Sequence, residues 1–125
     1  MEGVESLLYH LALLSDWETA RKDGEYRVST RGVTLDQEGF IHTSFPHQTL
    51  GVAERYYADV TEPLVLLHIE EERLTVPWRV DPVAGDAHGF PHVYGPIPVA
   101  AVTRTTPVHR DPATGTWTGL PPAIE

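Results

Sequence analysis

Short apolar blocks, separated by glycine, proline and charged residues, recur along the whole chain. Residues 7–14 and 64–69 are each almost continuously apolar, with a single histidine inside each run. Runs of this length without a polar face are typical of strands that are buried on both sides. Shorter runs rich in β-branched and aromatic residues predict further strands over residues 26–28, 40–43, 78–80 and 99–105.

Two helices are predicted, each directly after a strand. Ser15 and Glu18 have the spacing of a capping box, which predicts a helix over residues 16–22. We expect Ser44 to cap a second helix that runs to about Tyr57. With helices early and strands late, the chain is expected to form a mixed α+β domain, with both helices packed on mixed or antiparallel strands.

Glycine and proline mark several stretches as irregular. Residues 24–38 are polar and interrupted by glycine, so we expect mainly a loop there. Residues 90–98 contain three prolines, too many for a regular helix or a central strand, and predict a shaped, extended loop. Residues 108–117 are expected to form a hairpin. The expected organisation is one domain over residues 1–118 and a loose tail over 119–125.

Composition narrows the classes of function. With 9 basic and 18 acidic residues among 125, the net charge of −9 disfavours bulk nucleic-acid binding and anionic membranes. The absence of cysteine excludes disulfides, thiolate nucleophiles and sulfur-based zinc sites. No apolar run has the ~20 residues of a membrane helix. The first residues carry no basic cluster typical of a secretion signal, so we expect a cytoplasmic protein.

The chain has seven histidines against only nine lysines and arginines together, so the histidines are the first candidates for a functional site. Three of them lie in apolar or aromatic segments, namely His10, His42 and His92. Alternate residues of an extended chain share a face, so His92 would lie beside Phe90 and Tyr94. A neutral imidazole offers one hydrogen-bond donor and one acceptor. These segments therefore predict an uncharged, hydrogen-bonding cleft for a small molecule.

Each candidate also has a structural interpretation. His10 could equally be a core histidine that the backbone satisfies. Ser44 could act only as a helix cap, although a capped helix N-terminus after a strand also presents N–H groups to a phosphate. Tyr94 would stack on a planar ring, and Arg27 or Arg31 would contact a phosphate. No histidine pair has the spacing of a metal site, so no metal is expected.

The three histidine segments, in this order and spacing, resemble domain-of-unknown-function family 952 over about residues 8–102. The segments that carry the resemblance are Tyr9-His10-Leu11-Ala12 followed by Asp16-Trp17, the string from Gly39 to Ser44, and Phe90-Pro91-His92-Val93-Tyr94-Gly95-Pro96-Ile97. That family in turn resembles the ADP-ribosyltransferase superfamily. The resemblance implies a small split β-sheet fold that holds NAD in a cleft between two sheets.

In that likeness, His10 would contact the nicotinamide-side ribose or carboxamide. His42 and Ser44 would match a second motif, as in RNA 2′-phosphotransferases, and His92 and Tyr94 would fall in the third. The resemblance thus implies catalytic roles for the three histidines and NAD as a possible substrate. The third-motif glutamate of toxin-like transferases is not evident near Tyr94. Two functions therefore stay open: an ADP-ribosyl- or RNA 2′-phosphotransferase-like enzyme, and a non-catalytic module that binds a small molecule.

Overall fold

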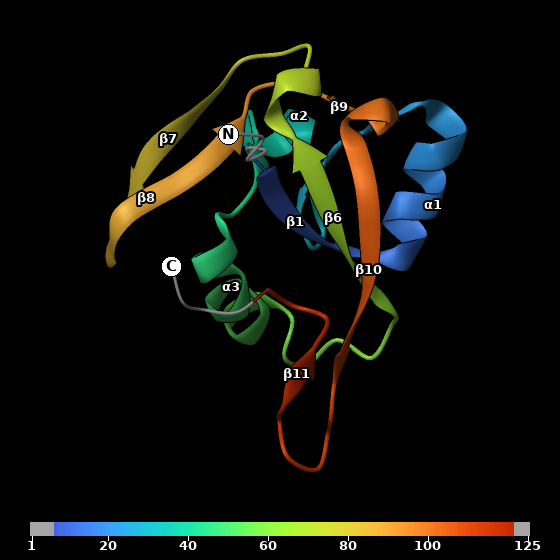
Figure 1. Ribbon diagram of the computed structural model, residues 1–125, viewed down its shortest axis with the longest axis vertical. Helices are drawn as coiled ribbons and strands as arrows, with labels where there is room; N and C mark the ends of the chain where they lie inside the picture. Colours follow the sequence, from blue (N-terminus) through green and yellow to red (C-terminus); the bar gives the residue numbers. More distant parts are fainter. Residues whose placement is uncertain (1–6, 122–125) are drawn as a thin grey trace, which may run out of the picture.

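The fold is a small α+β arrangement of mostly antiparallel strands with few helices (Figure 1). The computed structural model describes residues 7–121. A four-stranded sheet has the order β1 (Leu7–Leu13), β6 (Leu64–Glu70), β10 (Val102–Arg110) and β11 (Trp117–Thr118). A three-stranded sheet has the order β5 (Ile41–His42), β8 (Asp86–Val93) and β7 (Trp78–Val83). Two small pairs complete the strands: β2 (Glu25–Tyr26) with β9 (Ile97–Pro98), and β3 (Val28–Thr30) with β4 (Val33–Thr34).

The helices are short and lie on different sides of the four-stranded sheet. They are α1 (Leu14–Asp23), α2 (Leu35–Glu38) and α3 (Thr49–Tyr56), and the 3-10 turns are η1 (Pro46–Gln48), η2 (Glu71–Arg73) and η3 (Val99–Ala101). In Figure 1, α1 runs along one side of β1, β6 and β10, whereas the β7–β8 hairpin lies on the opposite side of the molecule. No helix in residues 7–121 is long and apolar enough to cross a membrane.

Strands β1 and β6 are buried on both faces, which explains their unbroken apolar runs. On one face, Leu8 and Leu67 join the core cluster that contains Trp17 of α1. On the other face, Leu11 and its neighbours join the cluster that contains Ala53 of α3. Both predicted strands and the packing of two early helices on antiparallel strands are therefore confirmed.

The capping box predicted for the first helix is wrong. Helix α1 begins at Leu14, and no side chain caps it, because the apolar strand β1 runs straight into it. The capping box lies instead in the stretch expected to be a loop, where the Thr34 hydroxyl accepts from the Gln37 backbone at 3.2 Å. The Gln37 side chain in turn accepts from the Thr34 backbone at 2.9 Å. That pair starts the single turn of α2.

Ser44 does not cap a helix, which corrects the prediction. Its backbone N–H donates to the Tyr9 carbonyl at 2.7 Å and its carbonyl accepts from the Tyr9 N–H at 2.9 Å. This bridge holds Ser44 in extended conformation against β1. The chain then turns through η1, and α3 begins only at Thr49. The backbone pairing therefore overrides the local preference of serine for a cap.

The expectation of an irregular loop over residues 90–98 is wrong for its first part. Strand β8 runs to Val93 and is the middle strand of its sheet, with Pro91 inside it. The Pro91 carbonyl accepts both the backbone N–H of Thr43, at 3.0 Å, and its hydroxyl, at 2.7 Å. A residue's N–H and C=O point to the same strand edge, so the missing N–H of proline faces this point, just beyond the end of β5. A central proline therefore leaves only one ladder hydrogen bond unmade, at the end of β5, while its carbonyl stays paired with Thr43.

The hairpin predicted over residues 108–117 is confirmed by the antiparallel pair of β10 and β11, in which Arg110 lies opposite Trp117. After it, Leu120 packs against the same core cluster as Trp117. Residues 122–125 of the expected loose tail lie outside the described residues.

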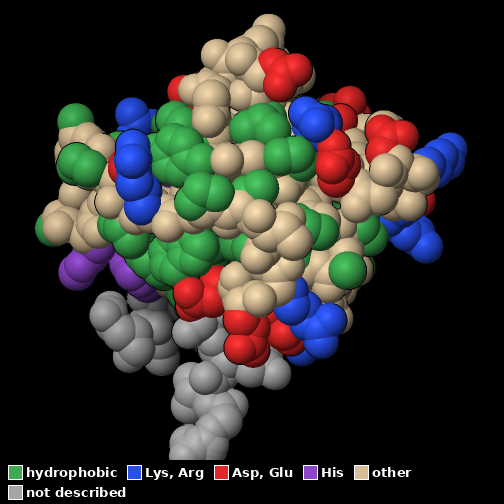
Figure 2. Space-filling model, turned by 90° about the horizontal axis from the view of Figure 1, so that it is seen from above, with side chains coloured by type: hydrophobic (Ala, Val, Ile, Leu, Met, Phe, Trp, Pro, Cys, Tyr) green, Lys and Arg blue, Asp and Glu red, His purple; other side chains and the backbone are tan. Residues whose placement is uncertain are grey.

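Charged side chains on the surface are mixed in sign. On the face shown in Figure 2, basic and acidic side chains surround a central group of hydrophobic ones, and histidine lies at one edge. Most described arginines are close to a carboxylate, as in the pairs Arg21–Glu18 at 3.3 Å and Arg73–Glu70 at 2.9 Å. Such exposed pairs contribute little stability, but they neutralise the positive charges locally.

Candidate functional site

One face of the three-stranded sheet collects histidine, aromatic and charged side chains. In the register of this sheet, His42 lies opposite His92, Arg79 lies opposite His92, and Asp81 lies opposite Phe90. Residues directly opposite each other in neighbouring strands have side chains on the same face. The rings of His42 and His92 are therefore neighbours, with centroids 5.4 Å apart, and His42 also contacts Phe90 at 4.8 Å.

His92 is buried and firmly held on this face. Its ring stacks on Phe40 with centroids 4.0 Å apart, and its Nδ1 lies 2.8 Å from the Asp81 carboxylate. The Tyr94 hydroxyl donates to the same carboxylate oxygen. Hydrogen bonds from Tyr94 and His92 lower the pKa of Asp81 to about 2, so Asp81 is ionised and accepts the Nδ1–H of His92. The Nε2 of His92 is buried and has no partner among residues 7–121.

His10 is fully engaged in the interior. Its Nδ1 lies 2.7 Å from the His42 carbonyl, and its Nε2 lies 2.9 Å from the Tyr26 hydroxyl. Because a carbonyl only accepts, Nδ1 carries the proton and Nε2 accepts from Tyr26. Burial lowers the pKa of His10 to about 4, so the ring is neutral at physiological pH. His10 therefore holds strand β5 in place from behind and leaves no ring nitrogen for a ligand.

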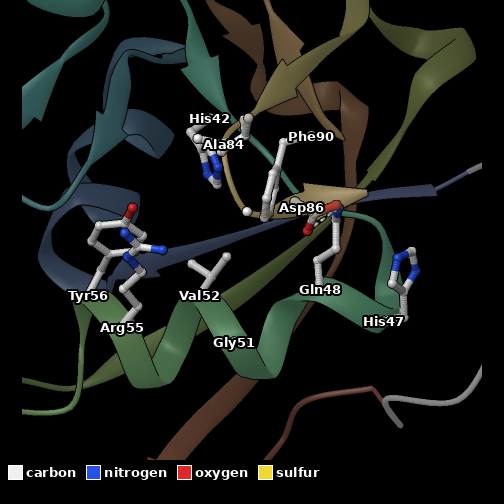
Figure 3. Close-up of a pocket in the computed structure, with 12 residues that line it drawn as sticks. His42, His47, Gln48, Gly51, Val52, Arg55, Tyr56, Ala84, Asp86 and Phe90 are labelled. Atoms are coloured by element: carbon white, nitrogen blue, oxygen red, sulfur yellow. Dashed lines mark hydrogen bonds between the residues drawn. The ribbon is translucent and has the colours of Figure 1, made fainter. Parts of the chain in front are cut away.

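A cavity of about 280 Å³ lies between α3 and the β7–β8 hairpin (Figure 3). We call it the His42 pocket, and the residues that line it are His42, His47, Gln48, Gly51, Val52, Arg55, Tyr56, Val83, Ala84, Gly85, Asp86 and Phe90. Burial and the neighbouring His10 and His92 lower the pKa of His42 to about 4, so its ring is neutral. Neither ring nitrogen of His42 hydrogen-bonds to any residue in 7–121.

The pocket has opposite charges at its two ends. Figure 3 shows Arg55 and Tyr56 at one end, and Asp86 beside Gln48 at the other. The Arg55 guanidinium lies 5.6 Å from the Tyr56 ring centre, and no described carboxylate lies within salt-bridge distance of it. The Gln48 amide donates to the Gly89 carbonyl at 2.6 Å and reaches Asp86 at 3.4 Å. Arg55, without an ion-pair partner among residues 7–121, and the oriented carboxylate of Asp86 thus flank the neutral centre.

The two arginines predicted to contact a phosphate lie outside this pocket. Arg27 is exposed and donates to Glu25 at 2.6 Å. Arg31 donates to Asp59 at 2.7 Å and to the Tyr56 carbonyl at 3.1 Å, where it fastens the end of α3. The pocket's own arginine is Arg55, on α3. Within the described chain, no cluster of three histidine, aspartate or glutamate side chains could hold a metal ion.

The chain matches one known protein family and several solved structures. The model of the family described as "Protein of unknown function (DUF952)" matches residues 11–105. The chain belongs to the DUF952 family. The crystal structure of protein CC0527 from Caulobacter crescentus is 29% identical, with a TM-score of 0.76, over 90% of this chain and 94% of that one. The solution NMR structure of CC0527 is 28% identical, with a TM-score of 0.65, over 92% and 90%. The curated proteins contain no match to this chain.

In this DUF952 chain, the structure brings together only some of the predicted site residues. His42, His92 and Tyr94 share one sheet face, whereas His10 lies behind it, and the backbone of Ser44 is paired with β1. Only His42 of this group lines the cavity.

Sequence reasoning missed Arg55 and Asp81. Arg55 has a signal that could have found it, because Gln48, Val52 and Arg55 recur at the spacing of one helix face. Asp81 has no comparable local signal, because its contact with His92 depends on the pairing of β7 with β8.

Proposed function

We propose that this DUF952 protein binds a small nucleotide-like ligand in the His42 pocket. Adenosine monophosphate, ADP-ribose and NAD are ligands of this kind. The observation that carries the proposal is the neutral His42 ring, without a hydrogen-bond partner among the described residues, facing a cavity that has Arg55 at one end and Asp86 at the other. The chain is short and acidic and contains no cysteine, which supports a location in the cytoplasm.

The chemistry of the lining fits the three parts of a nucleotide. A guanidinium binds phosphate oxygens through charge-assisted hydrogen bonds, which suits Arg55 at one end of the pocket. The rings of His42 and Phe90 offer flat surfaces to a base, and His42 adds one donor and one acceptor. A carboxylate accepts hydrogen bonds from ribose hydroxyls, which suits Asp86. Gln48, at the end of η1, and Arg55, on α3, are seven residues apart, which corresponds to a rise of about 10 Å along the pocket.

The size of the cavity limits how much of a dinucleotide it can enclose. Pockets for drug-sized ligands commonly measure roughly 300–1,000 Å³, and this one, at about 280 Å³, is at the lower end. We therefore propose that it encloses one mononucleotide half of NAD or ADP-ribose, with the other half lying on the protein surface.

A transferase is the second candidate, and one contact favours it. The chain has no glutamate near Tyr94 of the kind that toxin-like ADP-ribosyltransferases carry in their third motif. However, Asp81 places an ionised carboxylate against the Tyr94 hydroxyl. A carboxylate near the reacting ribose stabilises positive charge that develops when nicotinamide leaves. Nicotinamide release from NAD that disappears in His42→Ala would support transfer chemistry, whereas saturable binding without turnover would support a non-catalytic binding module.

Replacing Arg55 with alanine tests the binding site. We expect Arg55→Ala to weaken the binding of ADP-ribose or adenosine monophosphate by about tenfold to a hundredfold, because one charge-assisted hydrogen-bond partner of the phosphate is lost. Isothermal titration calorimetry measures the change. Arg21→Ala is the matched control, because Arg21 is exposed on α1 and pairs with Glu18. Equal affinities for Arg55→Ala and the wild type, or no heat with either ligand, would contradict the proposal.

A further inference from the structure

One ring nitrogen of the buried His92, next to the His42 pocket, takes no part in the proposed binding site. His92 is 5% exposed, and its Nε2 has no partner within residues 7–121. A buried polar atom without a partner costs free energy, roughly 1–3 kcal/mol, and such atoms call for an explanation such as a functional role. The other ring nitrogen of His92 is, in contrast, held firmly by Asp81 at 2.8 Å.

The protonation of His92 follows from this contact. Asp81 accepts from His92, from the Tyr94 hydroxyl and, at 2.8 Å, from the Arg79 Nε, so the carboxylate is surrounded by donors. An ionised carboxylate with three donors has no proton to give, and the His92 Nδ1 must carry the proton they share. In a neutral ring, Nε2 is then a lone-pair acceptor.

A neighbouring side chain that can donate to this acceptor is His42. The two ring centroids are 5.4 Å apart. Each imidazole nitrogen lies about 1.1 Å from its ring centre, so two nitrogens that point toward each other at this separation are about 3 Å apart, which is hydrogen-bonding distance. The outer torsion of a histidine side chain is broad, so His42 can reach this orientation by rotating its ring in place.

We propose that Asp81 and His92 are positioning residues for His42: the carboxylate holds His92 with Nε2 unprotonated, and that nitrogen accepts the ring N–H of His42. The remaining nitrogen of His42 then faces the pocket as an acceptor. The pocket consequently selects a ligand group with a donor, such as a ribose hydroxyl or an amide N–H, at this position. This last step rests on the proposed binding function, whereas the orientation of the two rings does not.

The orientation can be tested without any ligand. Long-range proton–nitrogen NMR spectra of the isotope-labelled protein identify which nitrogen of each imidazole carries the proton. In the wild type we expect His92 to be protonated at Nδ1 alone and His42 to show one dominant tautomer. In Asp81→Leu, which removes both acceptor oxygens, we expect the tautomer ratio at His42 to change by about twofold to tenfold, the effect of one net hydrogen bond. Asp36→Leu is the control, because Asp36 is an exposed carboxylate on α2.

The outcomes separate this inference from the proposed function. A wild-type His92 protonated at Nε2, or a His42 ratio that is equal in Asp81→Leu and Asp36→Leu, would overturn the positioning role. The wild-type spectrum decides the first point even if Asp81→Leu does not fold. Adenosine monophosphate binding, measured in parallel, should weaken by about threefold to tenfold in Asp81→Leu. If the wild type does not bind it while the tautomers are as expected, the proposed ligand is wrong and the positioning of His42 stands.

Discussion

Acidification from pH 7 to pH 4 should lower the free energy of unfolding by several kcal/mol through His10 and His42. Both rings have a pKa of about 4 in the folded protein, against an ordinary value of 6.5. The unfolded chain therefore binds protons before the folded chain does, and the folded state loses stability as the pH falls from 6.5 through 4. Above pH 6.5 the full stability is present. At 1.36 kcal/mol for each unit of pKa, each histidine contributes about 3 kcal/mol of this loss.

Urea denaturation at several pH values between 7 and 4 measures this dependence. Asp81 contributes little in this window, because its pKa of about 2 in the folded protein and its ordinary value of 3.8 both lie below pH 4. Burial also lowers the pKa of His68, which adds a smaller change of the same sign. His42→Gln, which cannot titrate, should show a shallower loss than the wild type. An unfolding free energy that stays constant or rises between pH 6.5 and pH 4 would refute the prediction.

Replacing His10 with alanine should cost about 4 kcal/mol of stability. The substitution opens a cavity at a site that is 3% exposed, and removing a large buried ring typically costs about 3–5 kcal/mol. It also leaves the His42 carbonyl and the Tyr26 hydroxyl without their partner. Chemical denaturation at pH 7 gives the value. His68→Ala is the matched control, because its half-buried ring hydrogen-bonds to Thr106 at 2.9 Å, and we expect it to cost only about 1 kcal/mol.

A milder variant covers the case in which His10→Ala does not fold. Tyr26→Phe keeps the ring and removes only the hydroxyl that His10 accepts from, and we expect a loss of about 1–2 kcal/mol. The interior role of His10 would be refuted if His10→Ala cost no more than His68→Ala, or if Tyr26→Phe were neutral.

The elements that could be predicted from the sequence are those whose signal is local. Strands β1 and β6 are continuous apolar runs because helices cover both faces of their sheet. The alternation of Phe90, His92 and Tyr94 correctly placed these side chains on one face, because period-two alternation is a property of any extended chain. The hairpin of β10 and β11 likewise follows from its local turn residues.

The errors arose where distant pairing overrode local preference. Ser44 has the local chemistry of a helix cap, but its backbone is bound to Tyr9, which lies 35 residues earlier in the chain. Pro91 is a strand breaker by itself, but it lies opposite the end of β5, where its carbonyl still accepts from Thr43 and only one ladder hydrogen bond is missing. Both outcomes depend on which strands meet, and residue preferences do not contain that information.

The α+β class, the buried strands and the aromatic and histidine residues from which a site could be built can all be predicted from the order of the amino acids. The separate roles of the three histidines, in contrast, depend on how the folded chain packs. His10 is closed off by the His42 carbonyl and Tyr26, His92 is oriented by Asp81, and of these three only His42 lines the cavity. The physical reason is that the state of an imidazole depends on its hydrogen-bond partners and burial, and here those partners come from segments far apart in the chain.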